Sequence, residues 1–585
     1  MNVTKAIDGG LDGEIGTSDD LVSTMTYFTP SNAAGRTGQI KEHKVYKQVV
    51  SSNNMLRHSK VQQLTSGSLA AKELRRYLNT TDFAQSDYEY DTYGNITKMT
   101  GPENASAQRD TVKVTYDNVV HTYPIKVENA FSDYTQTTYD YSTGQVLTSE
   151  DLNGNKIQYT YDDFFRIEKI LGPKEDHGNP DDFTIRYQYF PLGRHPESAT
   201  WEDRVPVAVT YHYQDQGDAS NVNYVSGIND DVVANPGIKE YTYNSGMWVA
   251  TMETSKNHLM TATFTDGLGR AVQVKKDISL WNGLQQVESR QVSGATKIDV
   301  RGLPTSQYLS VSEQNDETVF PLLRYNRTLS SISPTTTSYD YLGRAVSVSS
   351  PDAAGTGSYT ATVSYGWENK SGDDYFVTTS TDPDGRKNKV YVDARGQQRF
   401  TVADPNGVNA ETEFFYDVLG QLTSTQSVDD ETTSFTYDKF GRVTQEVHPD
   451  RGTTTTEYDL LGQVVSTTNA NGQQVDYDYN YSRLTDISYP ISGDLNDISY
   501  TYGSRGDGIN GAGRVTEITQ GLATAPVLVE KMNYDELGNV AVHTREIDIP
   551  NVGIQSFTSK TQYDSWGRIL KMTYPDGEQV RSFNP

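Results

Sequence analysis

A five-residue motif, Tyr-Asp-x-x-Gly, returns so regularly along this 585-residue chain that it limits the possible fold more than any other feature. Three successive copies, which start at residues 416, 437 and 458, are 21 residues apart. An active site is normally built once, whereas a structural unit is copied, so the spacing indicates a repeat architecture. Seven copies fit without gaps: Tyr90, Asp91, Gly94; Tyr339, Asp340, Gly343; Tyr416, Asp417, Gly420; Tyr437, Asp438, Gly441; Tyr458, Asp459, Gly462; Tyr534, Asp535, Gly538; and Tyr563, Asp564, Gly567.

Each position of the motif has a physical role in a β-hairpin. The side chain of Asp438 can accept a hydrogen bond from the backbone amide two residues on, which is how aspartate starts a turn. Gly441 stands where the turn needs a left-handed residue before the chain re-enters the hairpin. Phe435 and Tyr437 share one face of the strand before the turn, and Val443 opens the strand after it. The motif therefore predicts a hairpin tip.

A second turn closes each unit on its other side. In these turns proline presets the first dihedral angle and glycine takes the positive one. Two turns in 21 residues leave two strands of about six residues, a common strand length. The predicted fold is all-β, a long antiparallel meander whose tyrosines stack as a ladder across neighbouring strands. The second turns are SPDAAG (350–355), DPDG (382–385), DPNG (404–407), HPDRG (448–452), NANG (469–472) and YPDG (574–577).

Composition agrees with ordered strands and excludes several function classes. Apolar residues make up only 35% of the chain, but 40 tyrosines supply rings that can be buried while their hydroxyl groups reach a partner. A formal charge of −27 repels phosphate backbones, so nucleic acid is not an expected partner. The chain has no cysteine, which excludes disulfides and thiol chemistry. No apolar run approaches the roughly 20 residues of a membrane span.

Four regions can be distinguished along the chain. Residues 1–80 form a lead-in continuous with the array, residues 81–170 hold repeats, residues 171–330 hold divergent repeats with longer loops, and residues 331–585 hold regular repeats. Residues 68–79 (SLAAKELRRYLN) fit a short helix or a pair of strands equally well. The first residues lack the pattern of a signal peptide, and the sequence stops just after a turn. We therefore expect a piece of a longer chain.

The motif YDxxGR followed by a PDG turn at about 21-residue spacing resembles the YD-repeat (RHS-repeat) family. Its members include RHS polymorphic toxins, the B and C components of insecticidal toxin complexes, and teneurins. The resemblance is strong over 331–480 and clear over 81–170 and 530–580. It implies strands that spiral into a curved or hollow shell, which in the toxins encloses a C-terminal toxin polypeptide. The DPxG pair that cuts off the toxin in such proteins is not assigned here, because DPDG and DPNG occupy ordinary turn positions. The core domain that carries it is expected to be absent.

No catalytic, metal or cofactor site stands out in the sequence. Asp8, Asp12, Asp19 and Asp20 do not have the spacing of an EF-hand and are interpreted as a solvated turn. Histidines lack HxH or HExxH spacing, and no GxSxG or P-loop is present. GDGING (506–511) matches GxGxxG by letters, but the alternating RVTEIT that follows predicts a strand after a loop. Trp248 and Trp281 lie in divergent segments and are candidates for stacking on sugar rings, whereas Trp566 replaces a Leu or Phe of the repeat turn and is expected to pack there.

These observations predict a non-catalytic scaffold. The expected function is part of a shell that encapsulates a polypeptide toxin in a secreted or cell-surface bacterial system. Expected partners are the toxin cargo or other toxin-complex subunits, with surface glycans as a further possibility and with neither nucleic acid nor a membrane span. The alternative is a cell-surface adhesion or carbohydrate-binding repeat protein. A hydrolase would need one carboxylate whose replacement abolishes turnover without unfolding the array, and the sequence singles out none.

Overall fold

The structure, a computed structural model, describes most of the chain. The described residues are 4–9, 15, 17, 20–28, 39–64, 70–175, 177–178, 183–190, 206–213, 237–244, 247–253, 258–281, 286–314, 332–355, 357–490, 496–522, 525–563 and 567–581. Within them the only helical turn is a single 3-10 turn, η2 (Ser52–Asn54). The prediction of an all-β fold is therefore confirmed.

The first half of the chain builds one 19-stranded antiparallel sheet, in which almost every strand pairs with the strands before and after it. The chain leaves this order at β16 (Gly237–Asn244) and β17 (Met247–Glu253), which form a separate two-stranded sheet, and again at β21 (Thr296–Ile298) and β22 (Pro304–Gln307), which belong to the next large sheet. The strands are β1 (Lys5–Asp8), β2 (Leu21–Tyr27), β3 (Ile40–Lys47), β4 (Met55–Leu64), β5 (Ala71–Tyr77), β6 (Phe83–Tyr90), β7 (Ile96–Glu103), β8 (Arg109–Tyr116), β9 (Pro124–Glu128), β10 (Tyr134–Tyr139), β11 (Val146–Glu150), β12 (Lys156–Tyr161), β13 (Ile167–Leu171), β14 (Ile185–Phe190), β15 (Val207–Tyr213), β18 (His258–Thr265), β19 (Ala271–Trp281), β20 (Gln286–Ser293) and β23 (Val311–Gln314), with the separate pair β16 (Gly237–Asn244) and β17 (Met247–Glu253).

The second half builds a 23-stranded antiparallel sheet with the same consecutive order. The two sheets interleave where they meet, because β23 pairs back with β20 while β22 pairs forward with β24. The strands are β21 (Thr296–Ile298), β22 (Pro304–Gln307), β24 (Thr335–Tyr339), β25 (Ala345–Pro351), β26 (Ser358–Lys370), β27 (Asp373–Thr381), β28 (Lys387–Val392), β29 (Gln398–Ala403), β30 (Ala410–Tyr416), β31 (Leu422–Ser427), β32 (Thr432–Tyr437), β33 (Val443–His448), β34 (Gly452–Tyr458), β35 (Val464–Thr468), β36 (Gln474–Asn480), β37 (Arg483–Ser488), β38 (Ile498–Tyr502), β39 (Val515–Leu522), β40 (Ala525–Tyr534), β41 (Val540–Ile549), β42 (Gly553–Tyr563), β43 (Ile569–Thr573) and β44 (Gln579–Arg581).

The helix that the sequence allowed within 68–79 is wrong for the residues that are described. Residues 71–77 form β5, an interior strand in which Leu74 pairs with Val61 on one side and Ser86 on the other. Good helix formers such as Ala, Leu and Lys adopt a strand here because neighbouring strands supply the backbone hydrogen bonds, and tertiary context overrides local propensity.

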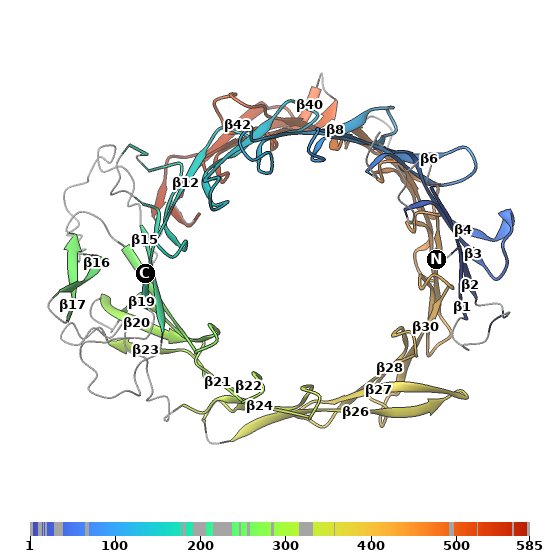
Figure 1. The fold of residues 1–585 in the computed structure, drawn as a ribbon, viewed down its shortest axis with the longest axis horizontal. Coiled ribbons are helices and arrows are strands. Elements are labelled where there is room, and N and C mark those ends of the chain that lie inside the picture. Colours follow the sequence, from blue (N-terminus) through green and yellow to red (C-terminus); the bar gives the residue numbers. More distant parts are fainter. Residues whose placement is uncertain are drawn as a thin grey trace.

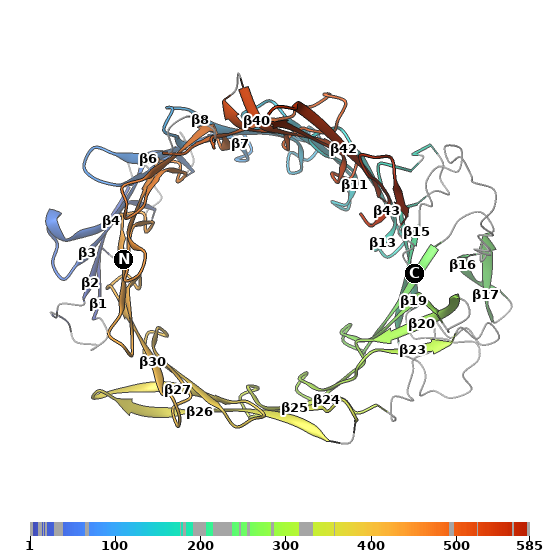
Figure 2. The same cartoon turned by 180° about the vertical axis from the view of Figure 1, so that it is seen from behind.

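The two sheets follow one another around a ring with an open middle (Figure 1). Seen from behind, strands of the second sheet run along the same arc as strands of the first, for example β40 beside β7 and β8 (Figure 2). The chain is thus a ribbon that coils for more than one turn. We call β1–β25 the first turn and β26–β44 the second turn. The predicted curved shell is confirmed as an architecture.

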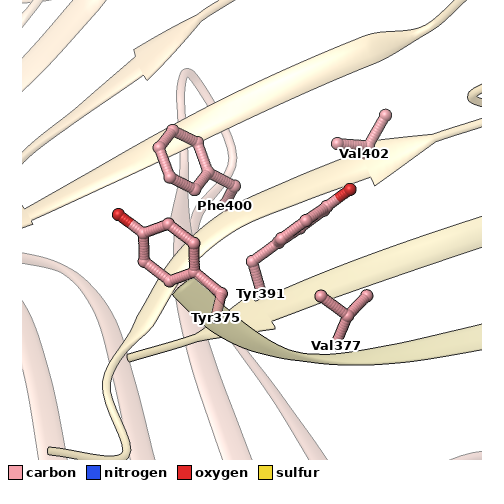
Figure 3. Close-up of a cluster of buried hydrophobic side chains, with 5 residues drawn as sticks. All are labelled: Tyr375, Val377, Tyr391, Phe400 and Val402. Atoms are coloured by element: carbon pink, nitrogen blue, oxygen red, sulfur yellow. The ribbon is translucent and has the colours of Figure 1, made fainter. Parts of the chain in front are cut away.

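The wall is thin, and few side chains are completely buried in it. A small cluster at β27–β29 contains Tyr375, Val377, Tyr391, Phe400 and Val402, all at most 7% exposed (Figure 3). The rings of Tyr375 and Phe400 meet edge to face with centroids 5.5 Å apart, an arrangement that aromatic quadrupoles favour. Most strand residues elsewhere are half-buried. This explains how an ordered chain can contain so few aliphatic residues.

Candidate functional site: hairpin tips and the seam between turns

The hairpin tip at Tyr437–Val443 shows how the repeat motif works. The Asp438 carboxylate accepts hydrogen bonds from the amides of Phe440 (2.8 Å) and Arg442 (3.0 Å). The amide of Gly441 donates to the Asp438 carbonyl at 3.0 Å, and the φ of Gly441 is +87°. The register shifts by one residue between Thr436 and Tyr437, which produces a β-bulge beside the turn. Aspartate, glycine and bulge together fix the direction of the returning strand.

Four of the other copies have the same geometry. Asp91, Asp340, Asp417 and Asp535 each accept amide hydrogen bonds from residues two and four positions later. At Asp459 the carboxylate is bound instead by the amides of Gly462 and Gln463. Asp564 lies outside the described residues. The motif glycines all have positive φ: Gly94, Gly343, Gly420, Gly441, Gly462, Gly538 and Gly567.

At Asp91, Asp340 and Asp535, burial raises the pKa of the tip carboxylate, but hydrogen bonds outweigh it and favour the ionised form. Burial by itself raises the pKa of Asp340, but hydrogen bonds from the Arg344 amide and guanidinium outweigh it and lower the pKa below its usual value. The guanidinium binds through Nε at 2.8 Å. The polar residue after the glycine is thus part of the tip when it is arginine, a role that the sequence pattern alone did not assign.

Tyrosine links each hairpin to the one before it. The Tyr437 hydroxyl donates to the Leu422 carbonyl at 2.7 Å, and the Tyr458 hydroxyl donates to the Val443 carbonyl at 2.9 Å. Each acceptor is the first residue of the returning strand in the preceding repeat. Burial raises the pKa of Tyr437, so the hydroxyl remains a donor.

The predicted tyrosine ladder is wrong for the three most regular copies. Among the described residues, the rings of Tyr416, Tyr437 and Tyr458 do not stack on one another. The Arg442 guanidinium lies 4.6 Å from the Tyr458 ring centroid instead, and donates to the Asp459 carbonyl at 2.6 Å. A 21-residue unit places successive tyrosines on alternate strands, with one strand between them, so an arginine and a backbone carbonyl bridge the gap.

The turns on the other side of the ribbon mostly place glycine in the left-handed conformation, as at Gly385 with φ +85°. DPNG (404–407) does not. Gly407 lacks a positive φ there, while Asp404 has φ +45° and Asn409 has φ +50°. The Asn409 amide donates to the Asp404 carbonyl at 2.9 Å, which makes the turn longer than four residues. Asparagine tolerates the left-handed region, and so the expectation of glycine at this point is wrong.

Arg505 stands at the centre of a seam that joins the two turns of the ribbon. Its guanidinium donates to the carbonyls of Tyr134 (3.0 Å), Asp151 (3.1 Å) and Leu152 (3.2 Å). It also pairs with the Glu150 carboxylate and lies 4.1 Å from the Tyr134 ring centroid. One side chain of the second turn thus holds two hairpins of the first turn.

Similar contacts continue along the seam, between residues that are 350 to 389 positions apart in the sequence. In every one, a YD-type hairpin tip of the second turn meets the opposite edge of the first turn. We call these two borders of the ribbon the YD edge and the opposite edge. The contacts are Arg395 with Asp8; Arg57 with Lys439 and Gln421; Ala105 with Asp459; Asn104 and Gln108 with Asn480 and Tyr481; Asp133 with Arg483; Asn153 with Ala512; Asn155 with Asn510; and Lys174 with Asp535 and Tyr563.

Candidate residues for other chemistry are dispersed in the structure. No group of three metal-ligating side chains lies together within the described residues. Asp8 is in the seam, Asp20 is buried, and Asp12 and Asp19 lie outside the described residues. In GDGING, the Asp507 carboxylate accepts the amides of Ile509 and Gly511, and β39 follows, as the sequence predicts.

Of the tryptophans considered above, Trp566 lies outside the described residues, as do the side chains of Trp248 and Trp281. In the part of the chain that is described, no helix has the length and hydrophobicity needed to cross a bilayer.

A ring of hairpins with a side-chain seam defines a class, the repeat-built β-shell proteins, and comparison with known proteins narrows it. Residues 416–453 match the family model for the RHS repeat. This part of the chain is therefore an RHS repeat, and the resemblance in its sequence is confirmed. None of the curated proteins matches the sequence.

Solved structures share the fold over nearly the whole chain. A crystal structure of TcdB2-TccC3 aligns with a TM-score of 0.69 at 14% identity, covering 97% of this chain and 32% of the other. TcdB2-TccC3 without its hypervariable C-terminal region gives 0.70 at 13% identity, over 97% and 34%. A Photorhabdus luminescens Tc holotoxin pore gives 0.67 at 14% identity, over 97% and 34%. The chain thus spans about a third of the length of these relatives.

Proposed function

We propose that this ring is a stretch of wall in a hollow shell that encloses a polypeptide cargo within a secreted bacterial toxin complex. The observation that carries the proposal is the seam. Hydrogen bonds and ion pairs between turns convert a coiled ribbon into a continuous wall. A wall of this kind separates an enclosed chain from solvent, and that task needs no turnover.

The fold relatives support the proposal because they are components of Tc toxins. The wall acts without catalysis in this proposal, and its partners are the cargo and other subunits of the complex. Nothing in the described residues favours the carbohydrate-binding alternative, so only the shell is carried forward.

Protection of a tethered cargo tests the proposal. An unfolded reporter peptide with protease sites would be attached after Pro585, and the protease would be coupled to beads too large to enter the ring. We expect cleavage several-fold slower than for the same peptide on an unrelated carrier. Arg505→Ala, which removes the centre of the seam, should restore fast cleavage.

Two results would contradict the proposal. One is equal cleavage of the reporter on this chain and on the carrier. The other is protection that survives in Arg505→Ala after hydrogen exchange has shown that the seam of this variant is open.

A further inference from the structure

The two borders of the ribbon are covered very differently. The YD edge of the second turn and the opposite edge of the first turn meet in the seam. The YD edge of the first turn carries large apolar side chains at its hairpin tips that remain exposed. These are Tyr93, Phe164, Phe165, Leu268, Val300, Tyr341 and Leu342.

Equivalent tip residues of the second turn show what such side chains do when they are covered. Phe440 is half-buried beneath the Arg76 guanidinium, 5.3 Å from the ring centroid. Leu461 lies against Gly101, 3.6 Å from where a β-carbon of that residue would stand. The free YD edge is therefore the same kind of surface as an interface that the protein already forms with itself.

The surface that fits this edge is the opposite edge of the second turn, which contacts no other turn of the ribbon among the described residues. At β42–β44 it contains a shallow hollow of about 580 Å³, lined by Ser556, Phe557, Tyr574, Pro575, Asp576 and Glu578. Its aromatic walls suit an aromatic ring, and its two carboxylates suit an arginine. An apolar hollow with a few charged groups is typical of a site that takes an anchoring side chain.

The free tip at β12–β13 has the complementary chemistry. Phe164 is 77% exposed and Phe165 is 66% exposed, and the Arg166 guanidinium lies 5.1 Å from the Phe164 ring centroid. Arg166 holds Asp162 of its own hairpin, as Arg442 holds Asp438. Arg442 also reaches a carbonyl of a neighbouring hairpin, so an arginine at this position can serve two partners at once.

The tip and the hollow occupy the same arc of the ring. Figures 1 and 2 show β11–β13 and β42–β43 side by side. Lys174, just after β13, donates to the Tyr563 carbonyl at the end of β42 at 3.1 Å. A second ring placed directly on the first along the ring axis would set its β12–β13 tip above this hollow, with the same curvature on both sides.

We propose that a second copy of this chain docks on the free edge, with Phe164 and Phe165 of one copy in the Phe557–Tyr574 hollow of the other. The two surfaces differ, so the contact is head-to-tail and continues into stacks. In this arrangement Arg166 lies opposite Asp576 and Glu578. Because salt screens the attraction between these charges, the contact should be weaker in high salt. This inference does not depend on whether the ring encloses a cargo.

Sedimentation velocity over a roughly hundredfold range of protein concentration tests the stack, because self-association follows mass action. The wild-type chain should sediment faster as its concentration rises, and less so in high salt. Phe164→Ser and Phe557→Ser should each stay monomeric. Val348→Ser, which removes an apolar side chain that is 37% exposed in the interior of β25, should behave as the wild type.

Mixing the two variants tests the direction of docking. Phe164→Ser retains an intact hollow and Phe557→Ser retains an intact tip, so an equimolar mixture should form dimers and nothing longer. A wild-type chain that stays monomeric throughout would overturn the proposal. So would association that survives in both variants, or that is also lost in Val348→Ser.

Discussion

The YD tips of the first and second turns share one motif but lie in different surroundings. In the second turn, the tips that include Phe440, Leu461 and Arg505 pack on the turn beneath them. In the first turn, the tips that include Phe164 and Tyr341 project from the border of the ribbon. The motif therefore fixes the bend of the chain, and position in the coil decides whether the two residues at the bend become core or surface.

This difference separates two sources of stability. The turn itself is local, because the aspartate, the amides and the left-handed glycine lie within five residues of one another. The seam is non-local, and each of its contacts closes a loop of at least 350 residues. Substitutions at matched positions of covered and free tips can therefore measure the seam apart from the hairpin.

Removing Arg505 should have the largest effect. Arg505→Ala leaves Glu150 and three carbonyls without their donor, and we expect a loss of about 2–3 kcal/mol. For comparison, Arg344→Ala at a free tip loses one ion pair and the contact with the Tyr365 ring at 4.0 Å, for about 1 kcal/mol. Hydrogen exchange over residues 130–155 is the readout, because it reports local opening. Unchanged exchange there in Arg505→Ala would mean that the seam does not hold the turns together.

Replacing a tip glycine with alanine should have the next largest effect on stability. Left-handed backbone costs any L-residue about 1–2 kcal/mol, and this term alone applies to Gly94→Ala, where no atom lies within 4 Å of the new β-carbon. In Gly441→Ala the β-carbon would also stand 3.1 Å from Arg57 Nη2 and displace a seam contact. Urea unfolding should place Gly441→Ala below Gly94→Ala in stability. Equal losses of stability in the two variants would mean that the whole cost comes from the left-handed backbone of the hairpin tip and none from the seam.

Truncating an aromatic tip residue should have a smaller effect on stability, and its size should depend on how far the ring is buried. Phe440→Ala removes a half-buried ring whose centroid is 5.3 Å from the Arg76 guanidinium and 5.1 Å from that of Arg442, and should cost about 1–2 kcal/mol. Tyr341→Ala removes a side chain that is 87% exposed, and its effect should stay within about 0.5 kcal/mol. Thermal unfolding at low protein concentration makes the comparison. A Tyr341→Ala loss as large as that of Phe440→Ala would indicate that the free tip is covered in solution.

Sequence patterns predict the local half of this architecture. Three features depend on residues close together in the chain: the turn chemistry of Asp438 and Gly441, the alternation of Phe435 and Tyr437, and the β-turn DPDG (382–385) on the opposite edge. The same periodicity, together with the resemblance to YD-repeat proteins, was enough to predict an antiparallel meander and its curvature.

Patterns could not predict contacts that depend on the number of repeats in one turn of the coil. Nothing near Arg505 in the sequence indicates which residues it contacts, and its partners are known only once the ribbon has closed on itself. The stacked tyrosine ladder was wrong for a similar reason. The pattern gives the face on which Tyr437 and Tyr458 lie, but not the arginine and carbonyl that connect their repeats across the intervening strand.

Acid should weaken the seam through Asp535, the smallest of the four effects. Burial by itself raises the pKa of Asp535, but hydrogen bonds from Asn539 and the Lys174 ammonium at 3.1 Å lower it below its usual value of 3.8. A carboxylate with a lowered folded-state pKa stabilises the protein fully above its unfolded-state value. That contribution is lost as the pH falls through the folded-state pKa.

Hydrogen exchange at residues 172–175, measured between about pH 5 and pH 2.5, should therefore show acid-induced opening that is flatter in Asp535→Asn. Asp340→Asn is the matched change at a free tip. The pKa of Asp340 is lowered by groups of its own hairpin, so its replacement should alter exchange in β24 and β25 only. If Asp535→Asn responded to acid like the wild type at residues 172–175, the ion pair with Lys174 would contribute nothing to the seam. The covered and free tips would then differ in packing alone.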